Sequence, residues 1–186
     1  MSDARRRILE SADQLLGERG YELVGINELI EKSGVAKATF YQHFRSKELL
    51  CLEWLKAVAR ESEADAQALL DGPLSPEKKV ARKFDGLGKY LKSSEFRGCP
   101  FSNTAVVMVK DNAVRALVEQ YKAATRRFWH ALSRQIRGEP LAARALGDAL
   151  FLLFSGAATE AQNSKALWPV ESAKAAALIL CQNASD

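Results

Sequence analysis

Apolar residues recur every three or four positions along the chain, a spacing that predicts amphipathic helices. The first is expected from Arg5 to Arg19, with Asp3 as its N-cap and Gly20 as its C-terminal stop, and the second over 26–33. Further helices are expected from residue 37, over 46–71 and 76–93, from residue 100, over 112–137, from residue 140 and over 171–181. The pattern therefore predicts about nine helices.

The stretch from Ile26 to Lys47 predicts two short helices joined by a tight turn. Gly34 stands where the first of them must end, because a left-handed backbone conformation is cheap only for glycine. Phe40 and Phe44 are four residues apart, so both are expected to pack inward from the second helix. A short helix presented in this way is typical of a helix-turn-helix, whose second helix enters the major groove.

The charge along this stretch supports contact with nucleic acid. Residues 1–50 contain eight basic and eight acidic side chains, and the net charge of the whole chain is only +4. From Lys32 to Lys47, however, there is no Asp or Glu. A locally acid-free face that carries cations, hydroxyls and an amide suits phosphates and base edges.

The sequence resembles the TetR/AcrR family of bacterial transcriptional regulators. The residues that carry the resemblance are Gly20-Tyr21, the run from Ser33 to Phe44, and Ser46-Lys47-Glu48-Leu49-Leu50. The resemblance implies an all-α homodimer. In it, residues 1–48 form a three-helix DNA-binding domain and residues 49–186 a larger helical bundle for ligand binding and dimerisation.

Roles on the second helix of the pair follow from its geometry. Lys37 and Thr39 lie at its N-terminal end, nearest the base edges, where Ala38 is placed to touch a thymine methyl group. Tyr41 and Gln42 project next and reach either bases or phosphates. The resemblance adds three positions: it implies phosphate contacts for His43 and Lys47, and a base contact for Asn27.

The resemblance also implies a small-molecule effector that binds in the C-terminal bundle and releases the DNA. Candidate lining residues are apolar or aromatic side chains of the expected helices, together with two polar residues that orient a ligand. They are Phe84, Leu87, Leu91, Phe101, Asn103, Met108, Phe128, Trp129, Phe154 and Thr159. Packing within a helical core explains the apolar members equally well.

The last two helices carry a different pattern. The segment from Pro140 is apolar on more than one face, and the final helix from Glu171 to Cys181 is rich in alanine. We expect the two helices to pair with those of a second copy in a four-helix interface. Lys122, Arg126, His130 and Arg134 form a basic stripe at four-residue spacing, which is explained by a solvated helix face more readily than by nucleic-acid binding.

The sequence has few residues of the types that form disulfides, metal sites or catalytic sites. Three widely spaced cysteines and two histidines argue against a disulfide framework and a metal site, and no catalytic motif is found, so we expect neither an enzyme nor a cofactor. The N-terminus lacks a signal-type apolar segment, which favours the cytoplasm. Two alternatives remain open: a protein-interaction adaptor, and a redox-responsive regulator that uses Cys99.

Overall fold

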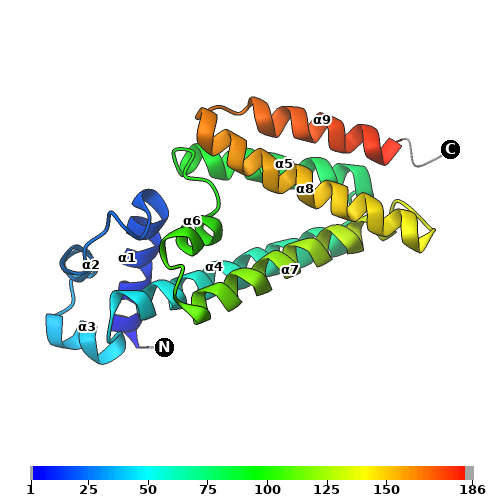
Figure 1. Cartoon of the computed structure of the whole chain (residues 1–186). Coiled ribbons are helices and arrows are strands. Elements are labelled where there is room, and N and C mark those ends of the chain that lie inside the picture. Colours follow the sequence, from blue (N-terminus) through cyan, green and yellow to red (C-terminus); the bar gives the residue numbers. More distant parts are fainter. Residues whose placement is uncertain (1, 183–186) are drawn as a thin grey trace. The chain divides into compact units, whose positions relative to one another are not determined.

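The computed structural model describes residues 2–182, and within them the chain forms nine helices and no strand (Figure 1). The helices are α1 (Asp3–Arg19), α2 (Ile26–Ser33), α3 (Lys37–His43), α4 (Lys47–Asp71), α5 (Pro76–Ser93), α6 (Pro100–Val107), α7 (Asn112–Arg134), α8 (Pro140–Ser164) and α9 (Trp168–Gln182). The predicted all-α architecture is confirmed.

The helices group into two compact units. The first unit combines residues 1–60 with 99–119, and the second combines 61–98 with 120–186. Helices α4 and α7 therefore each contribute their first part to one unit and the remainder to the other. This division reflects the packing of the helices alone. The boundary expected after residue 48, between a DNA-binding domain and a ligand-binding domain, stays a prediction.

Most helix ends lie where local chemistry places them. Ser75 caps α5, with Pro76 at the first helical position, and Gly34 ends α2 in the left-handed conformation with φ of 60°. The expected N-cap of α1 was wrong. Ser2 takes this role, because its hydroxyl accepts a hydrogen bond from the Arg5 amide at 3.3 Å, and Asp3 lies inside the first turn instead.

The end of α7 and the start of α9 also differ from the boundaries expected from the sequence. Helix α7 ends at Arg134, and residues 135–137 continue as tighter turns whose amides bond to the carbonyls of Leu132 and Ser133. Helix α9 begins at Trp168, three residues before Glu171. Pro169 is compatible with that start because the first turn of a helix needs no amide donor within the helix.

The core of the second unit is built around four aromatic rings. Trp129 is fully buried, and its ring centroid lies 5.8 Å from that of Phe84, 5.5 Å from that of Phe154 and 5.1 Å from that of Phe128. Helices α5, α8 and α9 pack against one another around this cluster, with α9 lying along α8 (Figure 1). Edge-on and tilted contacts of this kind add to the stabilisation from burial.

Helix α8 is long and apolar enough to cross a membrane, judged by length and composition alone. A core helix of a helical bundle has the same properties. Leu146 and Leu150 are buried, and the helix packs against α9 within the second unit. We therefore interpret its apolar character as a consequence of packing.

Helices α7 and α8 approach closely at Gly147. A Cβ atom added there would lie 3.0 Å from the Cα atom and 3.1 Å from the backbone nitrogen of His130. These are backbone atoms of the facing helix, so they cannot move aside as the end of a flexible side chain can. The contact thus requires glycine.

We predict that Gly147→Ala lowers the free energy of unfolding by about 1–3 kcal/mol, the usual cost of overpacking. Gly86→Ala on α5 is the control, because a Cβ there meets no atom within 4 Å. Replacing a glycine by alanine inside an open helix raises stability by roughly 0.5–1 kcal/mol. Urea denaturation of both variants checks the prediction, and equal effects would contradict the close approach.

Candidate nucleic-acid interface

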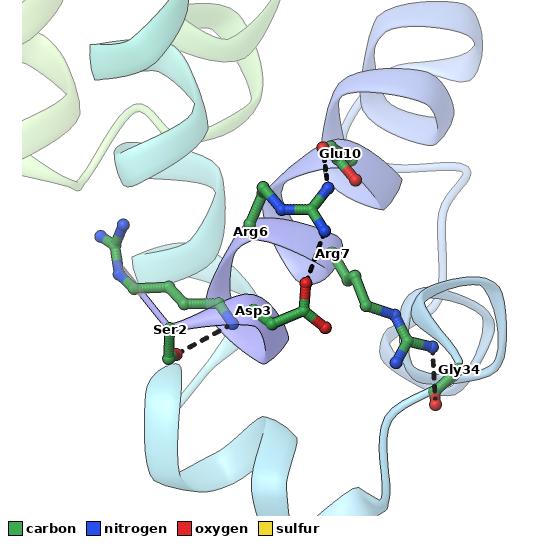
Figure 2. Close-up of polar contacts among 7 residues, drawn as sticks. Ser2, Asp3, Arg6, Arg7, Glu10 and Gly34 are labelled. Atoms are coloured by element: carbon green, nitrogen blue, oxygen red, sulfur yellow. Dashed lines mark hydrogen bonds and ion pairs between the residues drawn. The ribbon is translucent and has the colours of Figure 1, made fainter.

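The turn between α2 and α3 is held by a residue from α1. Arg7 donates a hydrogen bond from Nη2 to the carbonyl oxygen of Gly34 at 2.9 Å, as Figure 2 shows. A Cβ atom at Gly34 would collide with the same guanidinium group, and the positive φ is strained for any other residue. Both the conformation of the turn and its contact with α1 therefore favour glycine at this position.

Helix α3 has only seven residues and is anchored by two phenylalanines. Phe40 is fully buried, and Phe44, one residue past the end of the helix, is 3% exposed. The Arg5 guanidinium lies over the Phe44 ring at 5.3 Å and forms an ion pair with Glu53 of α4 at 2.9 Å. The inward packing expected for both phenylalanines is confirmed.

The opposite side of α3 faces solvent. Lys37, Ala38, Tyr41 and Gln42 are exposed, and Thr39 and His43 are half-buried. The Tyr41 ring packs edge-on against that of Phe40, with centroids 5.8 Å apart. Part of this side chain is therefore held by the core while 38% of the residue remains exposed. The predicted residues of α3 thus share an accessible, acid-free face, and their contacts with DNA stay predictions.

Asn27 is exposed near the start of α2. Gly25 caps this helix without a side-chain hydrogen bond. The neighbouring Glu28 is paired with Arg19 of α1, so its carboxylate is neutralised next to the candidate interface. The structure leaves Asn27 accessible for the predicted base contact.

Lys47 makes internal contacts that the sequence did not reveal. Its ammonium group donates to the carbonyl oxygens of Tyr21 and Val24, both at 2.8 Å, and lies 4.0 Å from the centroid of the Tyr21 ring. An ammonium group has three donors, so one remains for the predicted phosphate contact. The primary effect of Lys47 is to tie the α1–α2 loop to the start of α4.

Tyr21 and Glu48 extend this connection. The Tyr21 hydroxyl donates to the Glu48 carboxylate at 2.6 Å. This hydrogen bond, with a second from Ser46, lowers the pKa of Glu48, while burial and the same carboxylate raise the pKa of Tyr21. The tyrosine therefore stays protonated and the glutamate charged at neutral pH, and the bond between them persists.

The three arginines at the N-terminus serve the fold. Arg5 and Arg7 make the contacts described above, and Arg6 pairs with Asp3 and Glu10 on its own helix (Figure 2). The guanidinium groups of all three residues are thus engaged by protein atoms. His43 also turns toward the N-terminus, since its Nε2 atom lies 3.3 Å from the Ser2 hydroxyl oxygen.

Known proteins share this helix-turn-helix arrangement. A family model described as "Bacterial regulatory proteins, tetR family" matches residues 8–53. The crystal structure of a TetR-family transcriptional regulator from Streptomyces coelicolor superposes with a TM-score of 0.81 and 26% identity, covering 100% of this chain and 98% of that one. Residues 8–53 belong to the TetR family, and the whole chain has the fold of a TetR-family regulator.

Curated transcriptional regulators share shorter stretches with this chain. The transcriptional regulator LmrA of Bacillus subtilis is 31% identical over 106 residues, which is 55% of this chain and 50% of that protein. The transcriptional repressor NemR of Escherichia coli is 41% identical over 46 residues, 25% of this chain and 23% of that one. The matches thus span half or less of the length of these two relatives, and the identity is higher over the shorter stretch.

The candidate effector residues divide between the two units. Buried side chains in the second unit are Phe84, Leu87, Leu91, Phe128 and Trp129, joined by the half-buried Phe154. Phe101, Asn103 and Met108 belong to the first unit, and Thr159 is exposed on α8, where its hydroxyl donates to the Ser155 carbonyl. The structure brings six of the ten residues into one core, and their ligand contacts stay predictions.

Three polar groups near this core were not singled out from the sequence. The Trp129 Nε1 and Ser133 Oγ atoms are buried, one helical turn apart on α7, and have no hydrogen-bond partner among residues 2–182. Lys83 of α5 lies 5.2 Å from the Phe128 ring centroid, and burial lowers the pKa of its ammonium group. A buried donor without a partner costs about 1–3 kcal/mol, so such a group is a candidate for ligand contact.

The cysteines and histidines do not assemble into a metal site. No group of three or more His, Cys, Asp or Glu residues with suitable placement occurs within residues 2–182. Burial raises the pKa of the Cys51 thiol to about 12 and that of Cys181 to about 11, so both are protonated at neutral pH. Cys99 is half-buried at the start of α6.

We predict that Arg7→Ala lowers the free energy of unfolding by about 0.5–1 kcal/mol, the net contribution of a solvent-accessible hydrogen bond. Arg6→Ala is the matched control: it removes the same charge from α1, but its partners lie on that helix alone. Urea denaturation and amide exchange at Val35 measure the two effects. Equal protection of Val35 in both variants would contradict a clamp on the turn.

Proposed function

We propose that this chain is a homodimeric repressor of the TetR family, which occupies a pseudo-palindromic operator in the cytoplasm and leaves it when a small molecule binds. The observation that carries the proposal is the solvent-facing side of α3. Lys37, Tyr41 and Gln42 are exposed there without an acidic neighbour on the helix, while Phe40 fixes the helix from behind. In a dimer, two such helices enter successive major grooves about 34–36 Å apart.

We expect different residues of α3 to contact bases and phosphates. Lys37, Ala38 and Thr39 form the N-terminal turn, which in a helix-turn-helix lies deepest in the groove and reads bases. Gln42 offers both a donor and an acceptor, as bidentate recognition of adenine requires. His43 and the remaining donor of Lys47 suit phosphates, which give affinity without sequence preference.

We expect Lys37→Ala and Tyr41→Ala each to weaken operator binding at least tenfold, since a base contact contributes about 1–3 kcal/mol. The probe is a fluorescent duplex enriched from a random-sequence pool by the full-length protein. Lys89→Ala, which removes an exposed charge from α5, is the control and should leave affinity unchanged. Failure of the protein to enrich any sequence at moderate salt would refute the proposal.

Dimerisation is supported by exposed apolar side chains on the last two helices. Leu141 and Leu152 of α8 are 74% and 66% exposed, and Trp168 and Ile179 of α9 are 59% and 55% exposed. Large apolar groups gathered on neighbouring helices of a soluble bundle mark a contact surface. A twofold axis would place α8 and α9 of each copy against those of its partner in a four-helix interface.

We predict that Leu152→Asp converts the dimer to a monomer at micromolar concentration, because each interface would then bury two unpaired carboxylates. Leu74→Asp, at an exposed leucine in the loop before α5, should leave the dimer intact. Sedimentation velocity distinguishes the two variants. A monomeric unmodified protein, or a dimer that survives Leu152→Asp, would argue against this interface.

The interior of the second unit is where we place the effector. Three rings, Phe84, Trp129 and Phe154, surround the region, and the Trp129 N–H and Ser133 hydroxyl supply buried donors. A compound with an aromatic surface and a hydrogen-bond acceptor would complement them. Binding of this compound changes the affinity of the protein for its operator only to the extent that the compound binds the DNA-bound and DNA-free conformations with different affinities.

A further inference from the structure

Two lysines on one face of α5 differ in how their ammonium groups are satisfied. Lys79 is 5% exposed, and its Nζ atom donates to the Leu70 carbonyl oxygen at 2.6 Å and to Gln135 Oε1 at 3.1 Å. Lys83 lies one helical turn later and is half-buried, yet its ammonium group makes no hydrogen bond or ion pair within residues 2–182. Lys83 therefore has donors for which the described chain provides no acceptor.

Aromatic rings lie beside the Lys83 ammonium group. Its Nζ atom is 5.2 Å from the ring centroid of Phe128 and 6.0 Å from that of Phe154. Burial lowers the pKa of Lys83, and Asp65 of α4 offsets this effect only in part, because the two side chains are too far apart for an ion pair. An anion bound at this position would stabilise the charged form of the lysine.

Two buried donors of α7 border the same rings. Trp129 Nε1 and Ser133 Oγ have no hydrogen-bond partner among residues 2–182, although both residues are fully buried. The centroid of the Trp129 ring is 5.1 Å from that of Phe128 and 5.5 Å from that of Phe154. Trp129 and Lys83 thus share two aromatic neighbours, and Ser133 follows one turn along the helix.

The lysine contacts show that these donors lie along one interface between α5 and α7. Lys79 reaches Gln135, and Lys83 reaches Phe128, so this face of α5 runs antiparallel to α7 between the two contact points. The unpartnered donors of α7 lie between those points along the helix. Donors from both helices therefore border the same part of the core.

This part of the core reaches the surface at Lys83 and Phe154, which are half-buried. A ligand that enters there meets the ammonium group first, then the faces of the rings, and finally the buried donors. A neutral aromatic compound matches the rings but leaves the charge of Lys83 without a counterion. A carboxylate on an aromatic ring matches both, because charge-assisted hydrogen bonds are stronger than neutral ones.

We propose that this cluster binds a small aromatic carboxylate. Lys83 donates to the carboxylate, the ring of the ligand lies against Phe128 and Phe154, and the donors of Trp129 and Ser133 bind a second oxygen on that ring. The inference rests on the proposed function, since it names the chemical class of the effector for the interior of the second unit. It adds the requirement that the effector is negatively charged.

The three tryptophans of the chain provide a readout in the full-length protein. Trp54 Nε1 donates to Asp13 at 2.9 Å in the first unit, and Trp168 is 59% exposed at the start of α9. Their indole N–H signals in a ¹⁵N–¹H correlation spectrum serve as internal references. The variant Trp129→Phe assigns the third signal, which reports on the buried donor directly.

The probes are 4-hydroxybenzoate and the larger 6-hydroxy-2-naphthoate, each compared with its neutral amide. We expect both acids to cause a saturable shift of the Trp129 signal that is larger than the shifts of the two references. Each acid should bind at least about tenfold more tightly than its amide, because only the acid forms a charge-assisted hydrogen bond with Lys83. This comparison needs no variant, so it does not depend on the stability of a mutant protein.

The variant Lys83→Gln locates the charge requirement. It should weaken binding of the acids at least about tenfold and leave binding of the amides unchanged, because a neutral side chain replaces the ammonium group. Lys89→Gln is the matched control, since it removes an exposed charge from the same helix. Thermal denaturation verifies that both variants are folded.

Three outcomes would overturn the proposal: no saturable shift of the Trp129 signal with either acid, equal affinities for acid and amide, or equal weakening by Lys83→Gln and Lys89→Gln. All three are measured without DNA. An acid that binds as expected but leaves the affinity for the enriched operator unchanged would instead contradict the proposed release from DNA. Release by the amides and not by the acids would retain the proposed function and refute the charge requirement.

Discussion

The exposed face of α3, the candidate nucleic-acid interface, depends on the burial of two phenylalanine rings behind a helix that is too short to be stable alone. An isolated helix of fewer than about 12 residues is marginal in water, and α3 has seven. Phe40 and Phe44 compensate by removing their rings from solvent, and Arg5 covers Phe44 from the other side. Because the two buried rings lie on the inner face, most positions of the outer face can vary in sequence without loss of the fold.

Charge in the first unit is used mainly to position helices. Arg7 connects α1 to the turn, Lys47 connects the α1–α2 loop to α4, and Arg5 connects α1 to Glu53. These side chains account for much of the positive charge of the candidate nucleic-acid interface. The cations that remain accessible for the predicted DNA contacts are therefore fewer than the sequence suggests, and they include Lys32 on α2, Lys37 on α3 and Arg45 just beyond it.

The sequence predicted the parts of this structure that follow from short-range chemistry. Helical periodicity, the glycine at position 34 and the Ser75-Pro76 start signal each act within a few residues, so α2 and α5 were bounded correctly. The contacts of Arg7 and Lys47 join residues 26 or 27 positions apart, and no local pattern encodes them. For the same reason, the sequence did not reveal that four of the ten candidate effector residues lie outside the aromatic core, and their ligand contacts stay predictions.

The glycine at position 147 has a consequence for how the surface along α7 and α8 can diversify. It brings the two helices into backbone contact, so their spacing at this point is set by main-chain atoms and is independent of the side chains nearby. Exchanges at an exposed position such as Ala123 therefore alter the surface while the frame keeps its dimensions. A protein that retains this glycine can accept substitutions along this edge without a change in helix spacing.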